Sequence, residues 1–271
     1  MRRITLAAFA FWLVLAGPAR AERLLVGPAD GPAGIRLAAE KAADGDVIEV
    51  LPGTYVVEPV VLAGKRITLQ GAEPRPVIKG RELAPGHDDR ALVLVRSGDV
   101  TLRNFEFRGA RASDADGAGV RQEGGRLRVA GCAFFDNEHG VLTTNVADAE
   151  LTIEDSVFAQ APRVPGGLAH LLQVGRIARL VVSGSRFHGG FEGHLIKSGA
   201  RETRIAYNLV DDGERGEASY EIDLPNGGLA WIIGNVIGQS RLAQNRVLVA
   251  YGAQGPAWDR NALYLSHNTL I

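Results

Sequence analysis

Apolar and polar residues alternate in short segments that recur along most of this 271-residue chain. In seven such segments the first, third and eighth positions are mostly apolar, and the fifth is often Gly, Asp or Asn. The segments are VTLRNFEF (100–107), LRVAGCAF (127–134), LTIEDSVF (151–158), LVVSGSRF (180–187), TRIAYNLV (203–210), AWIIGNVI (230–237) and LYLSHNTL (263–270). A period of two predicts a β-strand, and the polar centre predicts a sharp turn into a second strand.

The repeat indicates a solenoid, because the segments return every 23 to 33 residues with loops of variable length between them. Their lack of a 3.6-residue period argues against stacked helical hairpins. A second series of short strands follows the first: 119–122, 140–144, 170–174, 194–198, 220–224 and 247–251. Parallel strands joined by crossovers are overwhelmingly right-handed. We therefore predict an all-β protein, a right-handed parallel β-helix.

The sixth position of the first series predicts a polar ladder at the bend. It holds Cys132, Ser156, Ser185, Asn208, Asn235 and Asn268. Stacked Asn side chains can bond from coil to coil, and Asn tolerates the left-handed backbone that a sharp bend requires. The single cysteine shares this register, so we interpret it as a small buried residue without reactive chemistry.

The second series predicts two columns of side chains. We expect an inward column of Leu142, Leu172, Ile196, Ile222 and Val249. We expect an outward column of Gln122, Thr143, Gln173, Lys197, Asp223 and Ala250. By the same parity, His170 and His194 are expected on the inward side at the starts of their strands.

The two ends of the solenoid differ. Residues 34–46 read as a capping helix with Ile35, Leu37, Ala38 and Ala42 on its apolar side, ending at Gly45. At the other end the chain stops within a repeat unit, at LYLSHNTLI. We expect an incomplete C-terminal cap, with the chain truncated or the last coil meeting a partner.

The first 21 residues have the order of a secretory signal peptide: Arg2 and Arg3, an apolar run over 4–16, and Ala19-Arg20-Ala21. A general export signal fits better than a twin-arginine signal. The prediction is cleavage after Ala21, a β-helix domain over 22–271, and a periplasmic or secreted location. With no further long apolar run, no membrane span is expected.

The composition of the chain limits the classes of binding partner. Removal of residues 1–21 leaves 27 basic residues against 31 acidic ones, which argues against a nucleic-acid partner. A single cysteine excludes an internal disulfide, so packing and backbone pairing must supply the stability.

The segment AAEKAADGDVIEVLPGTY, followed by KRITLQGAEPRPVIKG, resembles the opening of right-handed parallel β-helix proteins of the pectate-lyase-like superfamily. The repeats extend this resemblance to Ile271. It implies a polysaccharide-binding groove on the outer face of one sheet. The superfamily includes polysaccharide lyases, glycoside hydrolases, uronate epimerases and members without known catalysis.

The densest polar sequence, residues 194–228, supplies the candidate site. The segment resembles the calcium-dependent β-helix lyases, and by that register Lys197 matches their lysine while Asp223 stands in place of their arginine. The resemblance favours a lyase that removes the proton beside a uronate carboxylate. Candidate catalytic residues are Lys197, Arg201 and Tyr220, and candidate substrate-binding residues are His194, Gln173 and Asn226.

A cation is the second hypothesis. Glu221 and Asp223 lie two apart on one strand, so we expect both carboxylates to point the same way. With Asp211 or Asp212 from the preceding loop they could hold Ca²⁺ through oxygen ligands. Such an ion would also offset the effect of Asp223, since an adjacent carboxylate stabilises a protonated amine whereas a general base must be neutral.

Three alternatives stay open at the sequence level. Asp212 and Asp223 could act as a glycosidase pair, although the aspartate motifs of β-helix polygalacturonases are absent. Lys197 with Asp223, and Glu221 with Arg201, could be surface ion pairs worth roughly 0–1 kcal/mol each. The whole protein could also be a non-catalytic polysaccharide-binding or cell-envelope scaffold.

Overall fold

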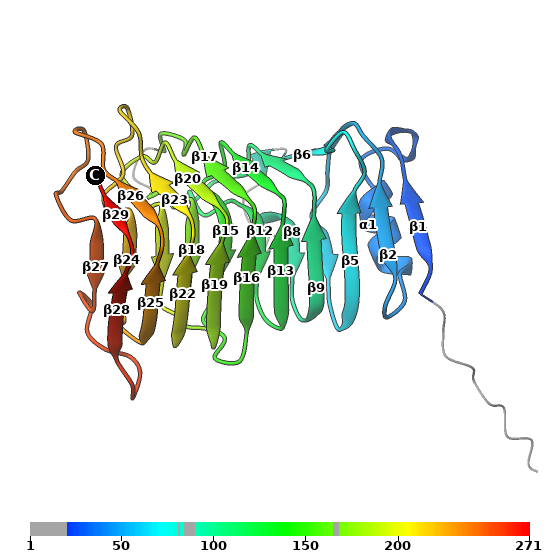
Figure 1. Cartoon of the computed structure of the whole chain (residues 1–271). Helices are drawn as coiled ribbons and strands as arrows, with labels where there is room; N and C mark the ends of the chain where they lie inside the picture. Colours follow the sequence, from blue (N-terminus) through cyan, green and yellow to red (C-terminus); the bar gives the residue numbers. More distant parts are fainter. Residues whose placement is uncertain (1–20, 81, 84–89, 165–167) are drawn as a thin grey trace, which may run out of the picture.

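The computed structural model describes residues 21–80, 82–83, 90–164 and 168–271, so the predicted signal peptide lies almost wholly outside the described residues. The chain winds into a parallel β-solenoid, as Figure 1 shows. Each turn contributes one strand to each of three long sheets, and every paired strand in these sheets runs parallel to its neighbour. The predicted all-β parallel β-helix is therefore confirmed.

The first sheet has ten strands and is built from the front halves of the repeats. Its strands are β1 (Arg23–Val26), β2 (Val47–Val50), β5 (Lys65–Gly71), β9 (Gly98–Arg103), β13 (Arg126–Ala130), β16 (Glu150–Glu154), β19 (Arg179–Ser183), β22 (Glu202–Ala206), β25 (Leu229–Ile233) and β28 (Ala262–Ser266).

The second sheet has nine strands and follows the first after a sharp turn. Its strands are β3 (Thr54–Val56), β6 (Val77–Lys79), β10 (Glu106–Arg108), β14 (Ala133–Phe135), β17 (Val157–Ala159), β20 (Arg186–His188), β23 (Leu209–Asp211), β26 (Val236–Gly238) and β29 (Thr269–Leu270).

The third sheet has eight strands and carries the second series of short segments. Its strands are β4 (Val60–Leu62), β8 (Ala91–Val95), β12 (Ala118–Gln122), β15 (His139–Thr143), β18 (Leu172–Val174), β21 (Ile196–Ser198), β24 (Ile222–Leu224) and β27 (Val249–Tyr251). The short strands β7 (Glu82–Leu83) and β11 (Arg111–Ala112) pair apart from these sheets.

The core is a continuous apolar column inside the coils. Its centre is a stack of phenylalanine rings from successive strands of the nine-stranded sheet, Phe107, Phe134, Phe158 and Phe187, with neighbouring centroids 4.5–5.0 Å apart. All four side chains are essentially fully buried. Stacked rings at this spacing match the distance between parallel strands, so one residue type repeats from coil to coil.

The predicted polar ladder is present at the turn between the first two sheets. Asn235 Oδ1 accepts from the backbone N–H of Asn208 at 2.9 Å and from its Nδ2 at 3.0 Å, and Asn268 does the same for Asn235. Ser156 and Ser185 continue the ladder. The left-handed residue is one position earlier than predicted, for example Tyr207 at φ 60°. The ladder residues therefore act through side-chain bonds.

The N-terminal capping helix exists but is shorter than predicted. Helix α1 spans Gly34–Lys41, after a short 3-10 helix, η1 (Pro28–Asp30). Ile35 and Ala42 are buried, as the pattern indicated, whereas Leu37 is 41% exposed. Among the described residues no helix is long and apolar enough to cross a membrane.

One predicted column of the eight-stranded sheet is out of register in its early coils. Val141, not Leu142, pairs with Leu172, and Leu142 pairs with Gln173. The cause is Gly140, which stands where the next coil has the inward Leu171: a Cβ on Gly140 would lie 2.7 Å from the Phe158 ring. Gln122 and Thr143 consequently fall outside the outward column, and both are buried.

Candidate functional site

Lys197 lies on the outer face of the eight-stranded sheet, in a row that runs across the coils. In this row Leu142, Gln173, Lys197, Asp223 and Ala250 are direct neighbours on β15, β18, β21, β24 and β27. From Gln173 onward this is the outward column that the sequence predicts. Lys197 is half-buried and Asp223 is 4% exposed, so the row contains a cation beside a sunken carboxylate.

A line of aromatic rings runs beside this row, at the starts of the same strands. The rings of His139, His170, His194 and Tyr220 follow one another with centroid distances of 5.8, 4.7 and 4.9 Å. His170 Nδ1 accepts the backbone N–H of His194 at 2.8 Å, which leaves the His170 proton on Nε2. The imidazoles therefore stack and fix one another's position.

His194 connects this line of rings to the outward row. Its Nε2 lies 3.4 Å from Asp223 Oδ2, although the parity of its strand predicted an inward side chain. Burial, with a further effect of Lys197, lowers the pKa of His194 to about 4, so the imidazole is neutral at pH 7. The contact is therefore between a neutral ring and a carboxylate, and it holds Asp223 without compensating its charge.

Lys197 and Asp223 do not form the predicted surface ion pair. Within the described residues, no carboxylate oxygen lies within 4.0 Å of the Lys197 ammonium. Burial raises the pKa of Asp223, and the positive charge of Lys197 partly opposes that rise. Lys197 thus influences Asp223 from a distance and keeps its ammonium available at the surface.

Three buried polar atoms of the row and the line of rings have no hydrogen-bond partner among the described residues: His139 Nδ1, His194 Nδ1 and Asp223 Oδ1. Buried polar atoms in folded proteins are normally bonded, so unpaired ones gathered beside a cation are informative. His194 Nδ1 and Asp223 Oδ1 supply unused acceptor capacity close to Lys197.

Glu221 faces a different environment from Asp223, contrary to the prediction. A sharp bend precedes β24, so Glu221 occupies the inward position that Leu195 holds one coil earlier. The side chain is fully buried, and its Oε2 accepts from Gln239 Nε2 at 3.0 Å. Burial, together with the charges of Asp212 and Asp211, raises the pKa of Glu221 to about 8. Glu221 is therefore protonated at neutral pH, and its predicted pairing with Arg201 is not observed.

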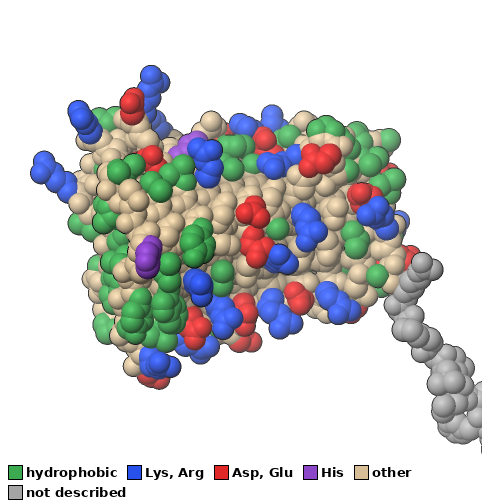
Figure 2. All heavy atoms as spheres, in the orientation of Figure 1, with side chains coloured by type: hydrophobic (Ala, Val, Ile, Leu, Met, Phe, Trp, Pro, Cys, Tyr) green, Lys and Arg blue, Asp and Glu red, His purple; other side chains and the backbone are tan. Residues whose placement is uncertain are grey.

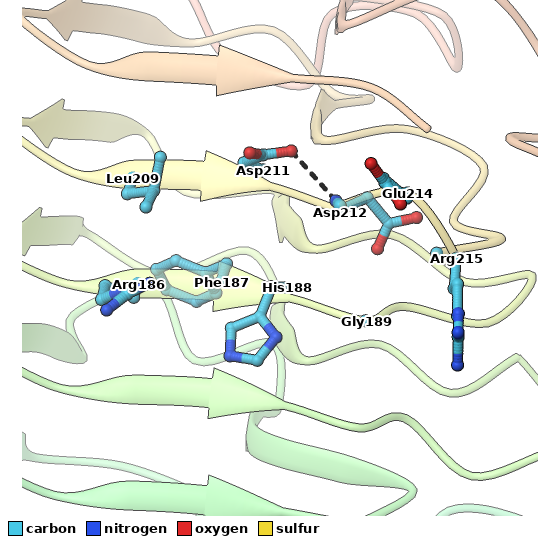
Figure 3. A pocket seen from close by; sticks show the side chains of 11 residues that line it. Arg186, Phe187, His188, Gly189, Leu209, Asp211, Asp212, Glu214 and Arg215 are labelled. Carbon is cyan, nitrogen blue, oxygen red and sulfur yellow. Dashed lines mark hydrogen bonds between the residues drawn. The ribbon is translucent and has the colours of Figure 1, made fainter. Parts of the chain in front are cut away.

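Asp211 and Asp212 lie at a third place, in a surface cavity of about 530 Å³ beside the end of β23 (Figure 3). Asp212 Oδ1 accepts the Gly190 N–H at 2.6 Å and Oδ2 accepts the Ala218 N–H at 2.9 Å, so this carboxylate fixes two loops. Asp211 Oδ1 accepts the Gly213 N–H at 2.9 Å. Figure 3 also shows His188 on the neighbouring strand β20.

The four predicted calcium ligands are therefore divided among three environments. The described residues contain no group of three or more His, Cys, Asp or Glu side chains placed to hold a metal ion. Glu221 is protonated and bonded to Gln239, and Asp212 is used by backbone donors. This donor set does not fit a calcium cage, because Ca²⁺ requires six to eight converging oxygen ligands. Asp212 and Asp223, the alternative glycosidase pair, also lie in different environments: Asp212 accepts two backbone N–H groups, and Asp223 lies beside His194.

The other predicted site residues lie at the margins of the row. Gln173 precedes Lys197 in the row, and Tyr220 ends the line of rings. Asn226 follows β24, with its Oδ1 beside Gly199. Arg201 is exposed in the turn after β21, where its backbone N–H donates to Ile177. Lys197, His194, Asp223 and Tyr220 are thus the predicted residues that the fold brings together.

Sequence reasoning missed two members of the cluster. His139 and His170 were not assigned to any site, yet they extend the line of rings from His194. The spacing of His170 and His194, 24 residues apart at matching positions of successive coils, was a usable signal. Aligning His139 with them would have required knowing that Gly140 replaces an inward leucine.

Comparison of the sequence with family models and with curated proteins yields no match. Solved structures with the same fold include the PL6 family alginate lyase AlyGC, at 16% identity and a TM-score of 0.64, over 93% of this chain. The chain spans only 40% of the length of that enzyme. The pectate lyase Pel9A matches at 15% identity and a TM-score of 0.58, over 94% of this chain and 78% of its own.

A third structure, Escherichia coli ybhc, matches 98% of this chain and 89% of its own at 14% identity and a TM-score of 0.54. These likenesses establish that the chain has the β-helix fold found in pectate-lyase-like proteins. The fold that the sequence resemblance implied is therefore confirmed.

Proposed function

We propose that this protein is a carbohydrate-active β-helix protein that acts as a lyase on a uronate-containing polysaccharide. The observation that carries the proposal is the cluster of Lys197, Asp223 and His194 on the outer face of the eight-stranded sheet, with two unused buried acceptors. The structural neighbours named for alginate and pectate lyases support the choice of substrate class.

The proposed reaction is an elimination within one sugar ring. The proton on the carbon beside the uronate carboxylate passes to the neutral amine of Lys197, and its electron pair forms a new carbon–carbon double bond. The glycosidic carbon–oxygen bond on the adjacent carbon breaks. The departing oxygen takes a proton from the Tyr220 hydroxyl. The proton held by the Lys197 amine then returns through water to the tyrosine, so both side chains recover their starting states. Asp223 and His194 do not exchange protons in this scheme.

Asp223 is assigned a positioning role. Its carboxylate is buried beneath the surface and held by His194 at 3.4 Å, so it cannot follow a mobile substrate. A fixed negative charge next to Lys197 orients the amine. Gln173, on the other side of Lys197 in the row, would contact the neighbouring sugar.

The second candidate function is non-catalytic binding of the same polysaccharide class. Lys197 lies at the surface with no carboxylate of the described residues within 4.0 Å, and a lysine ammonium binds a uronate carboxylate directly. In this case Lys197 would act as the cation of a binding groove. The two candidates predict the same contacts and differ only in whether product forms.

The test is incubation of the purified protein with alginate, polygalacturonate and chondroitin sulfate, followed by near-ultraviolet absorbance of the unsaturated product. Release of product from one of them supports the lyase. Binding by titration calorimetry without product supports the non-catalytic candidate. If neither product nor binding is detected with any of the three polysaccharides, both candidate functions are rejected.

We further propose that the protein is exported after cleavage behind Ala21, which leaves one residue, Glu22, before β1 begins at Arg23. The intact mass of the protein recovered from the periplasm or medium tests this. A mature chain beginning at Glu22 is expected, and an uncleaved chain in the cytoplasm would contradict it.

A further inference from the structure

A second polar and aromatic surface lies on the ten-stranded sheet, away from the site on the eight-stranded sheet. On its outer face, Arg204, Trp231 and Tyr264 are direct neighbours in register on β22, β25 and β28. The Trp231 and Tyr264 rings are nearly parallel, with an angle of 11° between their planes and centroids 5.8 Å apart. Figure 2 shows hydrophobic side chains gathered over this end of the sheet.

The two rings leave aromatic surface in contact with water. Tyr264 is 52% exposed and Trp231 is half-buried. The earlier residues of the same outward row are Thr101, Arg128, Thr152, Val181 and Arg204, of which only Val181 is apolar. Large aromatic side chains on a mostly polar outer face leave apolar surface in water, and such patches mark binding surfaces. Two nearly parallel rings on the outer face form a platform of aromatic surface against which the C–H face of a sugar ring can pack.

Polar groups adjoin the platform on one side. A hollow of about 290 Å³ is lined by Trp231 together with Arg204, Thr203, Glu202, Val181, Leu180 and Arg179. The Arg179 and Glu202 side chains are paired at 3.5 Å. Arg204 is exposed, and no carboxylate of the described residues lies within 4.0 Å of its guanidinium. The hollow therefore offers a guanidinium whose charge is not compensated by the protein.

We propose that this surface is a second glycan-binding site, in which a pyranose ring packs against Trp231 and Tyr264 while a sugar carboxylate bonds to Arg204. A pyranose has one face of C–H groups that matches an aromatic plane, and its edges carry hydroxyls. A planar guanidinium binds a carboxylate through two parallel hydrogen bonds. The acidic character of the glycan rests on the proposed function, whereas stacking on the platform does not.

The site would hold one stretch of a long polysaccharide while Lys197 contacts another stretch on a different sheet. Linking two weak contacts on one chain increases the local concentration of the polymer at the enzyme. The second site would therefore affect polymers far more than short oligomers. It is not required for the reaction itself, because none of its residues belongs to the row of Lys197.

The experiment measures binding of polygalacturonate and alginate oligomers by titration calorimetry and tryptophan fluorescence. The mature chain has two tryptophans, and Trp258 is held elsewhere by a bond from its Nε1 to the Gly199 carbonyl. A Trp258→Phe background makes Trp231 the reporter. Trp231→Ala should weaken oligomer binding at this site about fivefold or more, and Trp231→Phe should restore part of it. Arg204→Met should weaken acidic oligomers but not a neutral cello-oligosaccharide.

The matched control is Phe135→Leu, which removes an outward ring that lies under Arg108 on the nine-stranded sheet. It should leave binding unchanged. Unaltered oligomer binding by Trp231→Ala would overturn the proposal. It would also be overturned if Arg204→Met bound acidic oligomers as tightly as the wild type does, relative to neutral oligomers. A change in sedimentation rather than in glycan binding would also overturn it, because the platform would then contact a second copy of the chain.

Failure of this inference is distinguishable from failure of the proposed function. Lys197→Ala should abolish product formation while Trp231 fluorescence still responds to oligomers. Trp231→Ala should keep turnover of short oligomers and lose efficiency on polymers. Loss of short-oligomer turnover in Trp231→Ala, with the fold retained by circular dichroism, would contradict the assignment of two separate sites.

Discussion

The His194 imidazole lies with its Nε2 3.4 Å from Asp223 Oδ2, one coil away on the outer face of the eight-stranded sheet. The contact connects the line of stacked rings to the row that contains Lys197. It fixes the position of a buried carboxylate through a neutral partner.

Asp223→Asn should lower activity on the substrate at least tenfold while leaving the fold intact. Asn preserves the size of the side chain but removes the negative charge that orients Lys197. The readout is kcat and KM from the rate of product absorbance, with circular dichroism as the check on folding. Asp148→Asn serves as an exposed control, and equal activity of both variants would show that Asp223 has no role in the site.

Acid should destabilise the protein partly through His194. Its pKa is about 4 in the folded chain against 6.5 for an unperturbed histidine, so the unfolded state binds the proton more readily. This stability is present above pH 6.5 and is lost as the pH falls toward 4, about 3 kcal/mol for this residue. Urea unfolding from pH 7 to pH 4 should show a shallower decline for His194→Asn than for the wild type. Parallel curves would contradict the assignment.

Alkali should destabilise the protein through Glu221, so the pH dependence from this residue is opposite to that from His194. Its pKa of about 8 exceeds the ordinary 4.5, so the stability that the neutral carboxyl supplies is complete below pH 4.5 and is lost as the pH rises through 8. Glu221→Gln keeps the contact with Gln239 and removes the titration. Relative to the wild type, it should gain a few kcal/mol at pH 9. Thermal melts at pH 6 and pH 9 measure this, and an equal shift at both values would refute it.

Substitutions in the polar ladder should reduce the free energy of unfolding most where the ladder is buried. Asn235→Ala removes the Oδ1 that accepts two bonds from Asn208, and leaves a buried backbone N–H unpaired. The expected loss is roughly 2–4 kcal/mol in the free energy of unfolding. Asn268→Ala, at the more exposed end, should lose about half as much. Similar losses at the two positions would show that burial does not set the strength of the ladder.

Gly140 should tolerate no side chain. A Cβ there would lie 2.5 Å from the Leu171 carbonyl oxygen and 2.7 Å from the Phe158 ring, so Gly140→Ala must displace backbone or the phenylalanine stack. We expect a loss of about 2–4 kcal/mol. Gly27→Ala is the control, because its Cβ would meet its nearest neighbour at 3.5 Å. A stable Gly140→Ala variant would mean that the coil relaxes around the new methyl group.

The fold was predictable because its signals are local and repeated. The alternation of apolar residues, the ladder residues from Cys132 to Asn268 and the row from Gln173 to Asp223 each follow from a period of two applied coil after coil. Because the same pattern recurs in successive coils, each occurrence strengthens the prediction made from the others. The same reasoning located Lys197 correctly beside Asp223.

The site was less predictable because it depends on bends, where the period of two fails. His194 and Ile196 have the same parity, yet His194 contacts the outward Asp223 while Ile196 enters the core. Glu221 and Asp223 also share parity, yet a bend before β24 sends Glu221 inward to Gln239. The slip at Leu142 arose from a glycine that makes room for Phe158. These side-chain directions depend on packing between coils that are distant in sequence.

The central claim is tested most directly by product formation from a uronate polysaccharide. The rate of near-ultraviolet absorbance increase should be compared among the wild type, Lys197→Ala and Lys79→Ala, an exposed lysine on the nine-stranded sheet. We expect turnover by the wild type and Lys79→Ala, and a loss of at least a thousandfold in Lys197→Ala, on the order of removing a general base. Undiminished turnover by a folded Lys197→Ala protein would contradict it.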